Sequence, residues 1–326
     1  MGLTRREMIV GTGAAFSAVV SSPYVSRASE TYPARHVTIV NQFAAGSISD
    51  TTSRLIAQSL QDQLGQPFVV ENKPGAGGLI AATAVARAKP DGYTLLATVS
   101  SLHSAAALYK EMPLDLMGDF THIARLVSYP SFMTVRSTLP INTVQDLIAY
   151  AKANPAKLTY GHGNNMGQMV GEIFKRRTGV DLTRVAYRSN PAAMSDLVAG
   201  HIDVMVADIG TGWPHVESQK ARPLAVFSKQ RSALMPSVPT LDETVMPGFD
   251  VLPWGGLSGP AKMPSDVVGK LDAAISATFR SPETQKRFSA PGMEPYWADQ
   301  RTFEIYVQDQ LKNWTALIKE AGIPPQ

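Results

Sequence analysis

The chain has 326 residues, no cysteine and a formal net charge of +3 at pH 7. Without cysteine there are no disulfides, no thiolate nucleophile and no thiolate metal site. Residues 1–28 carry Arg5, Arg6, Arg27 and Glu7, a net +2, so the 298 residues that follow carry only +1. Nucleic acid is not expected as a partner of so balanced a chain.

Residues 1–28 have the pattern of an export signal rather than of folded structure. The string Thr4-Arg5-Arg6-Glu7-Met8-Ile9 is a twin-arginine motif, and a Gly/Ala-rich apolar run follows it as far as Val20. Ser26 and Ala28 are small residues at the third and first positions before a cut. The alternative is an ordinary secretory signal that contains two arginines by chance. A membrane anchor is disfavoured, since the apolar run is broken by glycines and serines and is too short to span a membrane. We expect a periplasmic protein from which the signal has been removed.

A strand, a small-residue turn and a helix open the remaining chain. Residues 37–40 form a β-branched run that predicts a buried strand, and Ala45-Gly46-Ser47 predicts a tight turn. Apolar or small residues then recur at helical spacing, at Ile48, Thr52, Ile56, Leu60 and Leu64. Ser47 or Ser49 can cap this helix and Gly65 can end it. Free backbone N–H groups and the helix dipole make such a helix start a site for an anion.

Further strands and helices alternate along the next stretch. Strands are expected at residues 68–71, 93–99 and 132–136, and helices at residues 79–89, after His103, and from Thr143 to Asn154. Thr143 and Asp146 have the spacing of a capping box. Short turns between strands and helices indicate a parallel sheet with helices on both faces.

The pattern of the first unit then recurs. Residues 158–168 predict a strand and a Gly-rich turn, and residues 169–177 a helix. Strands at 185–187, 202–207 and 224–227 and a helix at 191–200 follow, then a Pro-rich linker at 235–253 and helices at 266–280, 282–289 and 299–321. Two similar units predict two related α/β domains with a ligand between them, at the carboxyl ends of the strands. Facing helix starts suit a molecule with an anionic group at each end.

Motifs of the common catalytic and cofactor sites are missing from the sequence. It has no Gly-x-Ser-x-Gly elbow, Ser-x-x-Lys pair, Walker loop or His-Glu-x-x-His motif. The segment from Gly161 to Gly167 follows a predicted strand but has one residue too many for a dinucleotide fingerprint, so nucleotide binding is a weak alternative. The six histidines are scattered. We expect no cofactor, no metal and no catalytic residue.

Two strings carry a resemblance to a known family: Glu71-Asn-Lys-Pro-Gly-Ala-Gly-Gly78 and Pro90-Asp-Gly-Tyr-Thr-Leu-Leu96. With them the chain resembles the Bug-type (TctC-like) extracytoplasmic solute receptors, the substrate-binding components of tripartite tricarboxylate transporters. The resemblance covers nearly all of the chain after the signal. It implies a type II periplasmic binding protein, in which a strand hinge joins two α/β domains and the ligand cleft lies between them. The expected domains are residues 29–131 with 254–326, and residues 132–253.

The resemblance also implies where the ligand is held. Members of the family bind a carboxylate mainly through backbone N–H groups and waters of two loops, which correspond here to residues 43–50 and 163–168. The implied ligand contacts are Phe43, Ala45, Gly46, Ser47, Ile48, Asp50, Ser100, Ser101, His103, Asn164, Asn165, Met166, Gly167, Gln168, Tyr187 and Asp208.

Both loops depart from the family pattern. Ala45-Gly46-Ser47 stands in place of the usual Pro-Gly-Gly, and Asn164-Asn165-Met166-Gly167 in place of a Ser-rich loop. Tyr187-Arg188-Ser189 stands in place of a Tyr-Lys-Gly turn. The framework strings are kept while the lining differs, so the sequence does not identify the usual dicarboxylate as the ligand.

Several of these residues have an alternative, purely structural role. Asp50 can accept a hydrogen bond from a ligand or hold a water, or it can complement the helix dipole. Asp208 can bind a ligand amine or cap the end of a strand. Asn164 can be a ligand donor or a turn residue, His103 a half-buried core histidine, and Arg188 a solvated surface residue.

The first hypothesis is therefore a solute receptor that closes around a small organic acid and delivers it to the membrane permease subunits of a tripartite tricarboxylate transporter. The closed form could instead be read by a sensor protein. The second hypothesis is a periplasmic enzyme on the same two-domain scaffold.

Overall fold

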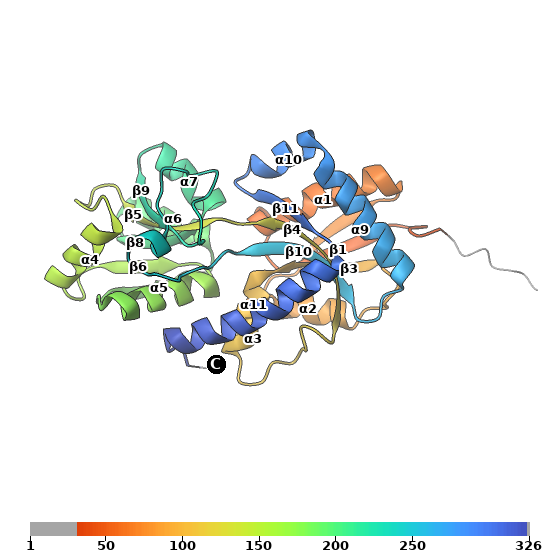
Figure 1. Ribbon diagram of the computed structural model, residues 1–326, viewed down its shortest axis with the longest axis horizontal. Coiled ribbons are helices and arrows are strands. Elements are labelled where there is room, and N and C mark those ends of the chain that lie inside the picture. Colours follow the sequence, from red (N-terminus) through yellow and green to blue (C-terminus); the bar gives the residue numbers. More distant parts are fainter. Residues whose placement is uncertain (1–30, 325–326) are drawn as a thin grey trace, which may run out of the picture. The chain divides into compact units, whose positions relative to one another are not determined.

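The computed structural model describes residues 31–324, and the chain from Tyr32 onward forms one compact unit. The predicted export signal lies outside the described residues. The described chain is a mixed α/β structure with two separate sheets (Figure 1).

The first sheet has six strands. Their order across the sheet is β2 (Phe68–Asn72), β1 (Val37–Asn41), β3 (Thr94–Val99), β10 (Trp254–Pro260), β4 (Phe120–Ser128) and β11 (Glu294–Ala298). Strands β2, β1 and β3 are parallel to one another, and β10 is antiparallel to both β3 and β4.

The second sheet has five strands in an equivalent order. It consists of β7 (Thr183–Ala186), β6 (Thr159–His162), β8 (Val204–Asp208), β5 (Ser131–Arg136) and β9 (Ala221–Val226). Again three strands are parallel, and the fourth, β5, is antiparallel to both of its neighbours. Strand β6 therefore occupies the place in the second sheet that β1 occupies in the first, which confirms the prediction of two related units.

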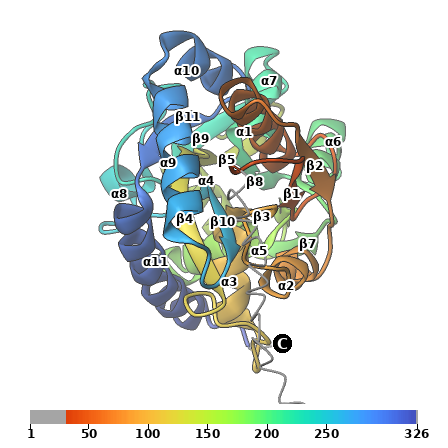
Figure 2. The same cartoon turned by 90° about the vertical axis from the view of Figure 1, so that its right-hand side faces the viewer.

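Helices cover both faces of the first sheet. They are α1 (Ile48–Leu64), the short η1 (Ala76–Gly78), α2 (Leu79–Ala86), α3 (Ser100–Leu108), α9 (Ser265–Arg280), α10 (Pro282–Ser289) and α11 (Gln300–Ala321). Figure 2 shows α1 and α10 above the strands and α2 and α3 below them. Two separate apolar cores result, one around Ile56 and Ile275 under α1 and α9, the other around Val40 and Leu102.

The second sheet carries α4 (Val144–Ala153), α5 (Asn165–Thr178), α6 (Asn190–Ala199), α7 (Ile209–Glu217) and α8 (Leu241–Thr244). The core beneath α4 and α5 includes Leu147 and Phe174, and the end of α11 adds Trp314 and Ile318 to it. The last helix thus packs on elements of both sheets.

Two segments cross between the sheets. Strand β4 continues into β5 through Tyr129 and Pro130, and residues 227–253 return from β9 to β10. The two segments are hydrogen-bonded through their backbones, since the Tyr129 N–H donates to Pro253 O (2.7 Å). The fold class is confirmed as α/β with two sheets joined by crossing strands. The exact domain boundaries at 131 and 253 stay a prediction.

Most helix ends agree with the sequence, although α3 begins at Ser100 and α5 at Asn165, ahead of the starts expected after His103 and at residue 169. Ser281 caps α10, Asp299 caps α11, and Thr143 and Asp146 form the capping box of α4. Helix α1 ends at Gly65, which adopts the left-handed conformation.

Sequence reasoning missed β4, β10, β11, α7 and the short α8, which lies inside the predicted linker at 235–253. Strand β10 contains three glycines and a proline, a composition that disfavours strands. Its glycines are required by packing, since a Cβ at Gly256 would lie 2.4 Å from Phe303 Cζ. Helix α7 carries Pro214 in its interior, and its glycines further obscure the helical pattern.

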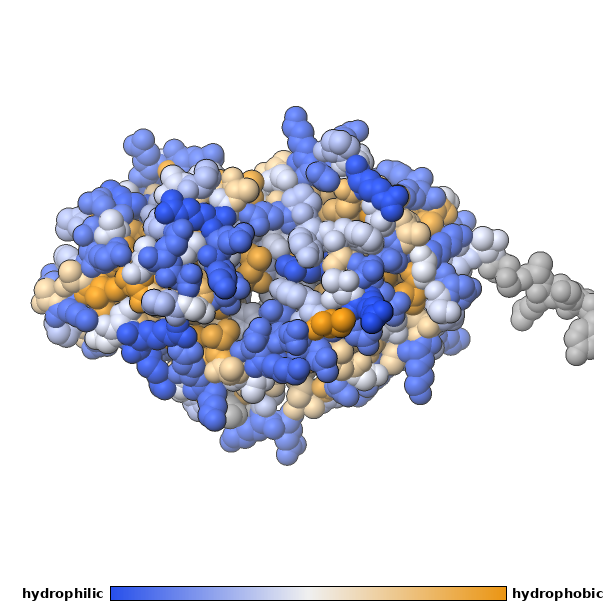
Figure 3. All heavy atoms as spheres, viewed as in Figure 1, coloured by the Kyte–Doolittle hydropathy of each residue, from blue (hydrophilic) through white to orange (hydrophobic). Residues whose placement is uncertain are grey.

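None of the helices within residues 31–324 is long and apolar enough to cross a bilayer. The face of the molecule seen in Figure 3 is largely hydrophilic, with hydrophobic residues in small separate areas. Scattered exposed apolar residues of this kind are normal on a protein surface.

We predict that Gly255→Ala destabilises the protein by about 2 kcal/mol, because the core must shift to admit the extra carbon. A Cβ at Gly255 would lie 2.3 Å from Tyr129 Oη, which shares a hydrogen bond with Thr52 Oγ1 (3.0 Å). Urea denaturation measures the change. The matched control is Gly269→Ala in the interior of α9, where nothing lies within 4 Å and alanine favours the helix. Equal stability of the two variants would contradict the explanation that Tyr129 leaves no room for a side chain at position 255.

Candidate ligand-binding site

The first predicted loop connects β1 to α1. Ser47 is the N-cap of α1, and its Oγ accepts the Asp50 N–H (3.2 Å). Ser49, the alternative cap, instead donates to Asn41 Oδ1 (2.6 Å) and so holds the end of β1. Ala45 and Gly46 are exposed, and Ile48 is half-buried.

The Asp50 carboxylate holds this loop together. The side chain is 5% exposed and accepts from Gly46 N–H (2.9 Å), Asn72 Nδ2 (3.0 Å) and Arg54 Nε (3.1 Å), while Arg54 Nη2 lies 3.0 Å from its Oδ1. Burial raises the pKa of Asp50, but the hydrogen bonds from Arg54, Gly46 and Asn72 and the charge of Arg54 outweigh it, so the pKa is lowered overall. The carboxylate is thus an ionised support of the loop with several donors of its own.

Asn72 supports the first loop and was not singled out by sequence reasoning. Besides Asp50, its Nδ2 donates to Phe43 O (2.8 Å), and Asn41 Nδ2 donates to the same carbonyl (3.0 Å). Asn41 and Asn72 are register partners at the carboxyl ends of neighbouring parallel strands. The sequence signal that could have indicated their role is that each asparagine directly follows a predicted strand. Phe43, which they position, is half-buried and packs against the core under α1.

The second predicted loop connects β6 to α5. Asn164 is the N-cap of α5, and its Oδ1 accepts the Gly167 N–H (2.8 Å). A Cβ at Gly163 would lie 2.1 Å from Asn190 N, so only glycine fits here. Asn165 is half-buried, while Met166, Gly167 and Gln168 are buried.

Asn190 links three loops of the second sheet and was also missed. Its Oδ1 accepts the Gly163 N–H (3.1 Å), and its Nδ2 donates to Asp208 Oδ2 (2.5 Å). Asp208 is the N-cap of α7 and accepts from both Thr211 N (2.9 Å) and Thr211 Oγ1 (3.0 Å). The strand-end cap that the sequence offered as the alternative role of Asp208 is therefore present.

Tyr187 lies after β7, with its hydroxyl directed at α6. The hydroxyl donates to Asp196 Oδ2 (2.7 Å). Burial and the Asp196 carboxylate raise the pKa of Tyr187 to about 12. Arg188 beside it is exposed, as its structural alternative predicts.

Ser100, Ser101 and His103 lie in the first turns of α3, which has no side-chain cap. Ser100 Oγ accepts the Trp254 N–H (3.3 Å), and the His103 ring lies 4.8 Å from the Trp254 ring. Burial, together with the charge of His122, lowers the pKa of His103 to about 3. His103 is thus a neutral, buried histidine rather than the half-buried one we expected.

The structure brings parts of the predicted site together at the junction of the two sheets. A Cβ at Gly210 would lie 3.3 Å from Ile48 Cδ1 and 3.5 Å from Asp208 Oδ1, so the start of α1 faces the start of α7. A Cβ at Gly77 would lie 3.4 Å from Asn165 Nδ2, so the start of α5 faces η1.

Several buried polar atoms near these strand ends have no hydrogen-bond partner within residues 31–324. They include Gln42 Oε1 after β1, Ser101 Oγ after β3 and His162 Nε2 at the end of β6. Buried polar groups without partners are rare in native proteins and often belong to sites that bind water or a ligand.

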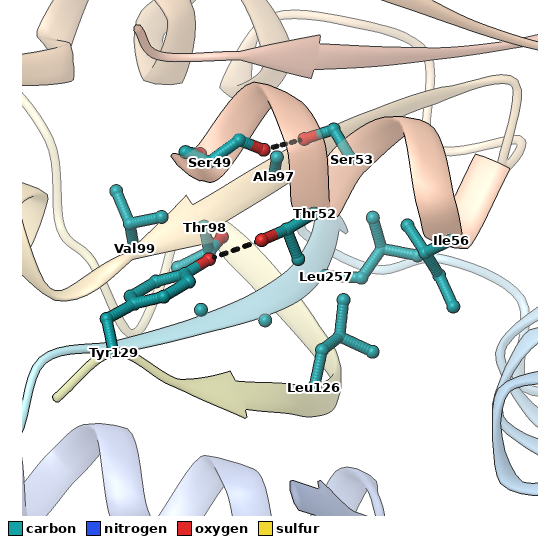
Figure 4. A pocket seen from close by; sticks show the side chains of 12 residues that line it. Ser49, Thr52, Ser53, Ile56, Ala97, Thr98, Val99, Leu126, Tyr129 and Leu257 are labelled. Carbon is teal, nitrogen blue, oxygen red and sulfur yellow. Dashed lines mark hydrogen bonds between the residues drawn. The ribbon is translucent and has the colours of Figure 1, made fainter. Parts of the chain in front are cut away.

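A small cavity lies beneath the first turns of α1 (Figure 4). Ser49, Thr52, Ala97 and Tyr129 are among its lining residues, and the Thr52–Tyr129 hydrogen bond crosses it. It has room for about one water molecule, and none of the predicted ligand contacts lines it. Within the described part of the chain, no group of three or more His, Cys, Asp or Glu side chains could hold a metal ion.

The chain is similar to known proteins over most of its length. A family model described as the tripartite tricarboxylate transporter family receptor (TctC) matches residues 52–323. BugT of Bordetella pertussis is 29% identical over 326 residues, which cover 99% of either protein.

Two solved structures are similar over most of the chain. Rpa4515 of R. palustris with adipate has a TM-score of 0.84 and 32% identity, covering 90% of this chain and 100% of that one. MatC of Rhodopseudomonas palustris with bound malate has a TM-score of 0.78 and 30% identity, covering 88% of this chain and 100% of that one.

These matches define the class as a solute-binding receptor with an α/β fold in two domains. The chain belongs to the tripartite tricarboxylate transporter receptor family, whose members are substrate-binding receptors rather than enzymes, and the Bug-type resemblance is confirmed.

We predict that Asp50→Asn lowers the free energy of unfolding by about 2 kcal/mol at pH 7, because charged hydrogen bonds within the loop are lost. The folded-state pKa of Asp50 is depressed, so its stabilisation is fully present above the unfolded-state pKa of about 3.9 and is lost as the pH falls through the folded-state value. Urea denaturation between pH 7 and about pH 2 should show the two proteins converging in stability only below about pH 4. Asp62→Asn, at an exposed position on the same helix, is the control, and a difference that stays constant with pH would contradict the prediction.

Proposed function

We propose that this protein is a periplasmic solute receptor that binds a small organic carboxylate and delivers it to the permease of a tripartite tricarboxylate transporter. The observation that carries the proposal is the position of α1 and α5. Helix α1 follows β1, which lies between β2 and β3 in its sheet, and α5 follows β6, which lies between β7 and β8. In both sheets the next strand of the chain is added on one side of this central strand and the one after it on the other side, so the order of strands reverses there. Ligands of open α/β sheets bind at such switch points, outside the carboxyl ends of the strands.

The chemistry of both helix starts suits an anion. The N–H groups of Ile48 and Ser49 in α1, and of Asn165 and Met166 in α5, belong to first turns and so have no intrahelical partner. No other hydrogen bond within residues 31–324 occupies them. Together with the helix dipoles, they favour carboxylate oxygens.

Asp50 is compatible with an anionic ligand nearby. Arg54 contacts both of its carboxylate oxygens, so its negative charge is compensated within the loop. The repulsion that an unpaired aspartate would exert on a ligand carboxylate is thereby reduced. Ser47 and Asn164 cap the two helices and would shape the ligand loops rather than supply charge.

The relatives support the ligand class. Rpa4515 was solved with adipate and MatC with malate, and each is at least 30% identical to this chain. The proposed contacts are the predicted residues of the two loops, with Tyr187, Asp208 and the start of α3 around them. The altered loop residues Ala45, Ser47, Asn164 and Asn165 would set which carboxylate is preferred.

The remaining parts of the proposal follow from the family and the first 28 residues. The twin-arginine pattern supports export to the periplasm, where a receptor would meet its ligand and the permease. We infer that no reaction occurs on the ligand. A sensor protein that reads the ligand-bound form is the second candidate partner.

We predict that at least one acid from a panel raises the melting temperature, because a ligand that binds only the folded state stabilises it. The panel contains adipate, malate, hydroxy acids, aromatic acids and amino acids. Asn165→Ala should weaken binding of the active acid about tenfold, the value of one good polar contact. The control is Asn313→Ala, at an exposed position on α11. Absence of a shift with every acid, and of any acid bound to the purified protein in native mass spectrometry, would overturn the proposal.

A further inference from the structure

Arg125 on β4 is a buried cation outside the proposed ligand site. The residue is 6% exposed, and its guanidinium lies between two tyrosine rings, 4.4 Å from the centroid of Tyr296 and 4.1 Å from that of Tyr306. Nη2 donates to Ser128 Oγ (2.8 Å), whereas the buried Nε has no partner within residues 31–324. No carboxylate of the described residues forms an ion pair with it.

The acidic side chains around Arg125 are engaged elsewhere. Glu294 is the register partner of Ser128, but its carboxylate accepts from Ser232 Oγ (2.7 Å). Asp250 lies near Tyr306, and its Oδ1 accepts the Lys229 N–H (3.0 Å). A buried charge without a counter-charge is costly and is usually paired. The Arg125 guanidinium therefore has no carboxylate partner within the described residues and can still donate to one.

Tyr296 covers one face of this guanidinium. It lies on β11, the edge strand of the first sheet, and is 48% exposed. The pairing of β11 with β4 shifts between Pro295 and Ala298, so Tyr296 is outside the regular ladder. An exposed tyrosine stacked on an arginine, at an edge strand, has the composition of an energetic centre of a protein interface.

We propose that Arg125, Ser128, Tyr296 and Tyr306 form a docking point for an aspartate or glutamate side chain of a protein partner. The carboxylate would pair with the guanidinium, in the charge-assisted geometry that arginine favours. The partner that fits is the membrane component that receives the ligand. The identification of the partner as this membrane component rests on the proposed function. The recognition of an acidic side chain rests only on Arg125, Ser128 and the two tyrosines.

The test follows the Arg125 Nε–H signal of the full folded chain by nitrogen-15 NMR, with the signal assigned through Arg125→Lys. The probes are a capped Gly-Asp-Gly tripeptide and its Gly-Asn-Gly analogue. We expect a saturable shift with the aspartate peptide only. Tyr296→Ala should weaken that binding about tenfold through loss of the cation–π face, and Tyr296→Phe should preserve it. Trp297→Ala is the matched control, because the Trp297 indole donates to Asp272 in α9.

Three outcomes would overturn the docking point. The first is the same shift with both peptides or with neither. The second is tighter binding of free adipate than of the aspartate peptide, which would indicate a small-anion site. The third is an Arg125 signal displaced by Asp250→Asn without any peptide, which would show that Asp250 is its counter-charge in solution. The organic acids of the panel should raise the melting temperature of Tyr296→Ala as much as that of the unmodified chain. Failure of this inference can therefore be distinguished from failure of the receptor proposal.

Discussion

The Asp50 carboxylate is the constraint on which the rest of the first loop depends. It ties the exposed turn at Gly46 to α1 through Arg54 and to the neighbouring strand through Asn72. Without this tie, a turn of small residues would have many backbone conformations and would lose them on binding, at an entropic cost. Because the tie is made within the protein, the N–H groups at the start of α1 are already oriented before any ligand arrives.

The second sheet reaches the same result with different residues. There Asn190 connects the loops after β6 and β8, and Gly163 permits the close approach that this requires. Each sheet thus places a capped helix at the end of its central parallel strand, held by an amide side chain, from the end of β2 in the first sheet and from the start of α6 in the second. The equivalence lies in the order of strands and the physics of helix starts, since the supporting side chains differ.

Local signals in the sequence were sufficient for most helices and for the repeated strand–turn–helix unit. The spacing of Ile56 and Leu60 and the cap Ser47 depend only on neighbours in the chain, whereas α5 begins at Asn165, ahead of the expected start at residue 169. Strand β10 could not be predicted in this way, because its glycines are selected by the rings of Tyr129 and Phe303, which come from distant segments. Asn72 was missed for the same reason, as its partners lie far away in the sequence. The family resemblance supplied the fold class, while the ligand contacts remain predictions.

The backbone pairing of the two crossing segments has a consequence for how such a receptor can change over evolution. The Tyr129 N–H of one crossing segment donates to the Pro253 carbonyl of the other. Main-chain pairing is largely indifferent to side-chain identity, so substitutions in the ligand loops leave the connection between the sheets intact. New ligand specificities can therefore arise through substitutions in the proposed ligand loops, while the main-chain hydrogen bond between the crossing segments is kept.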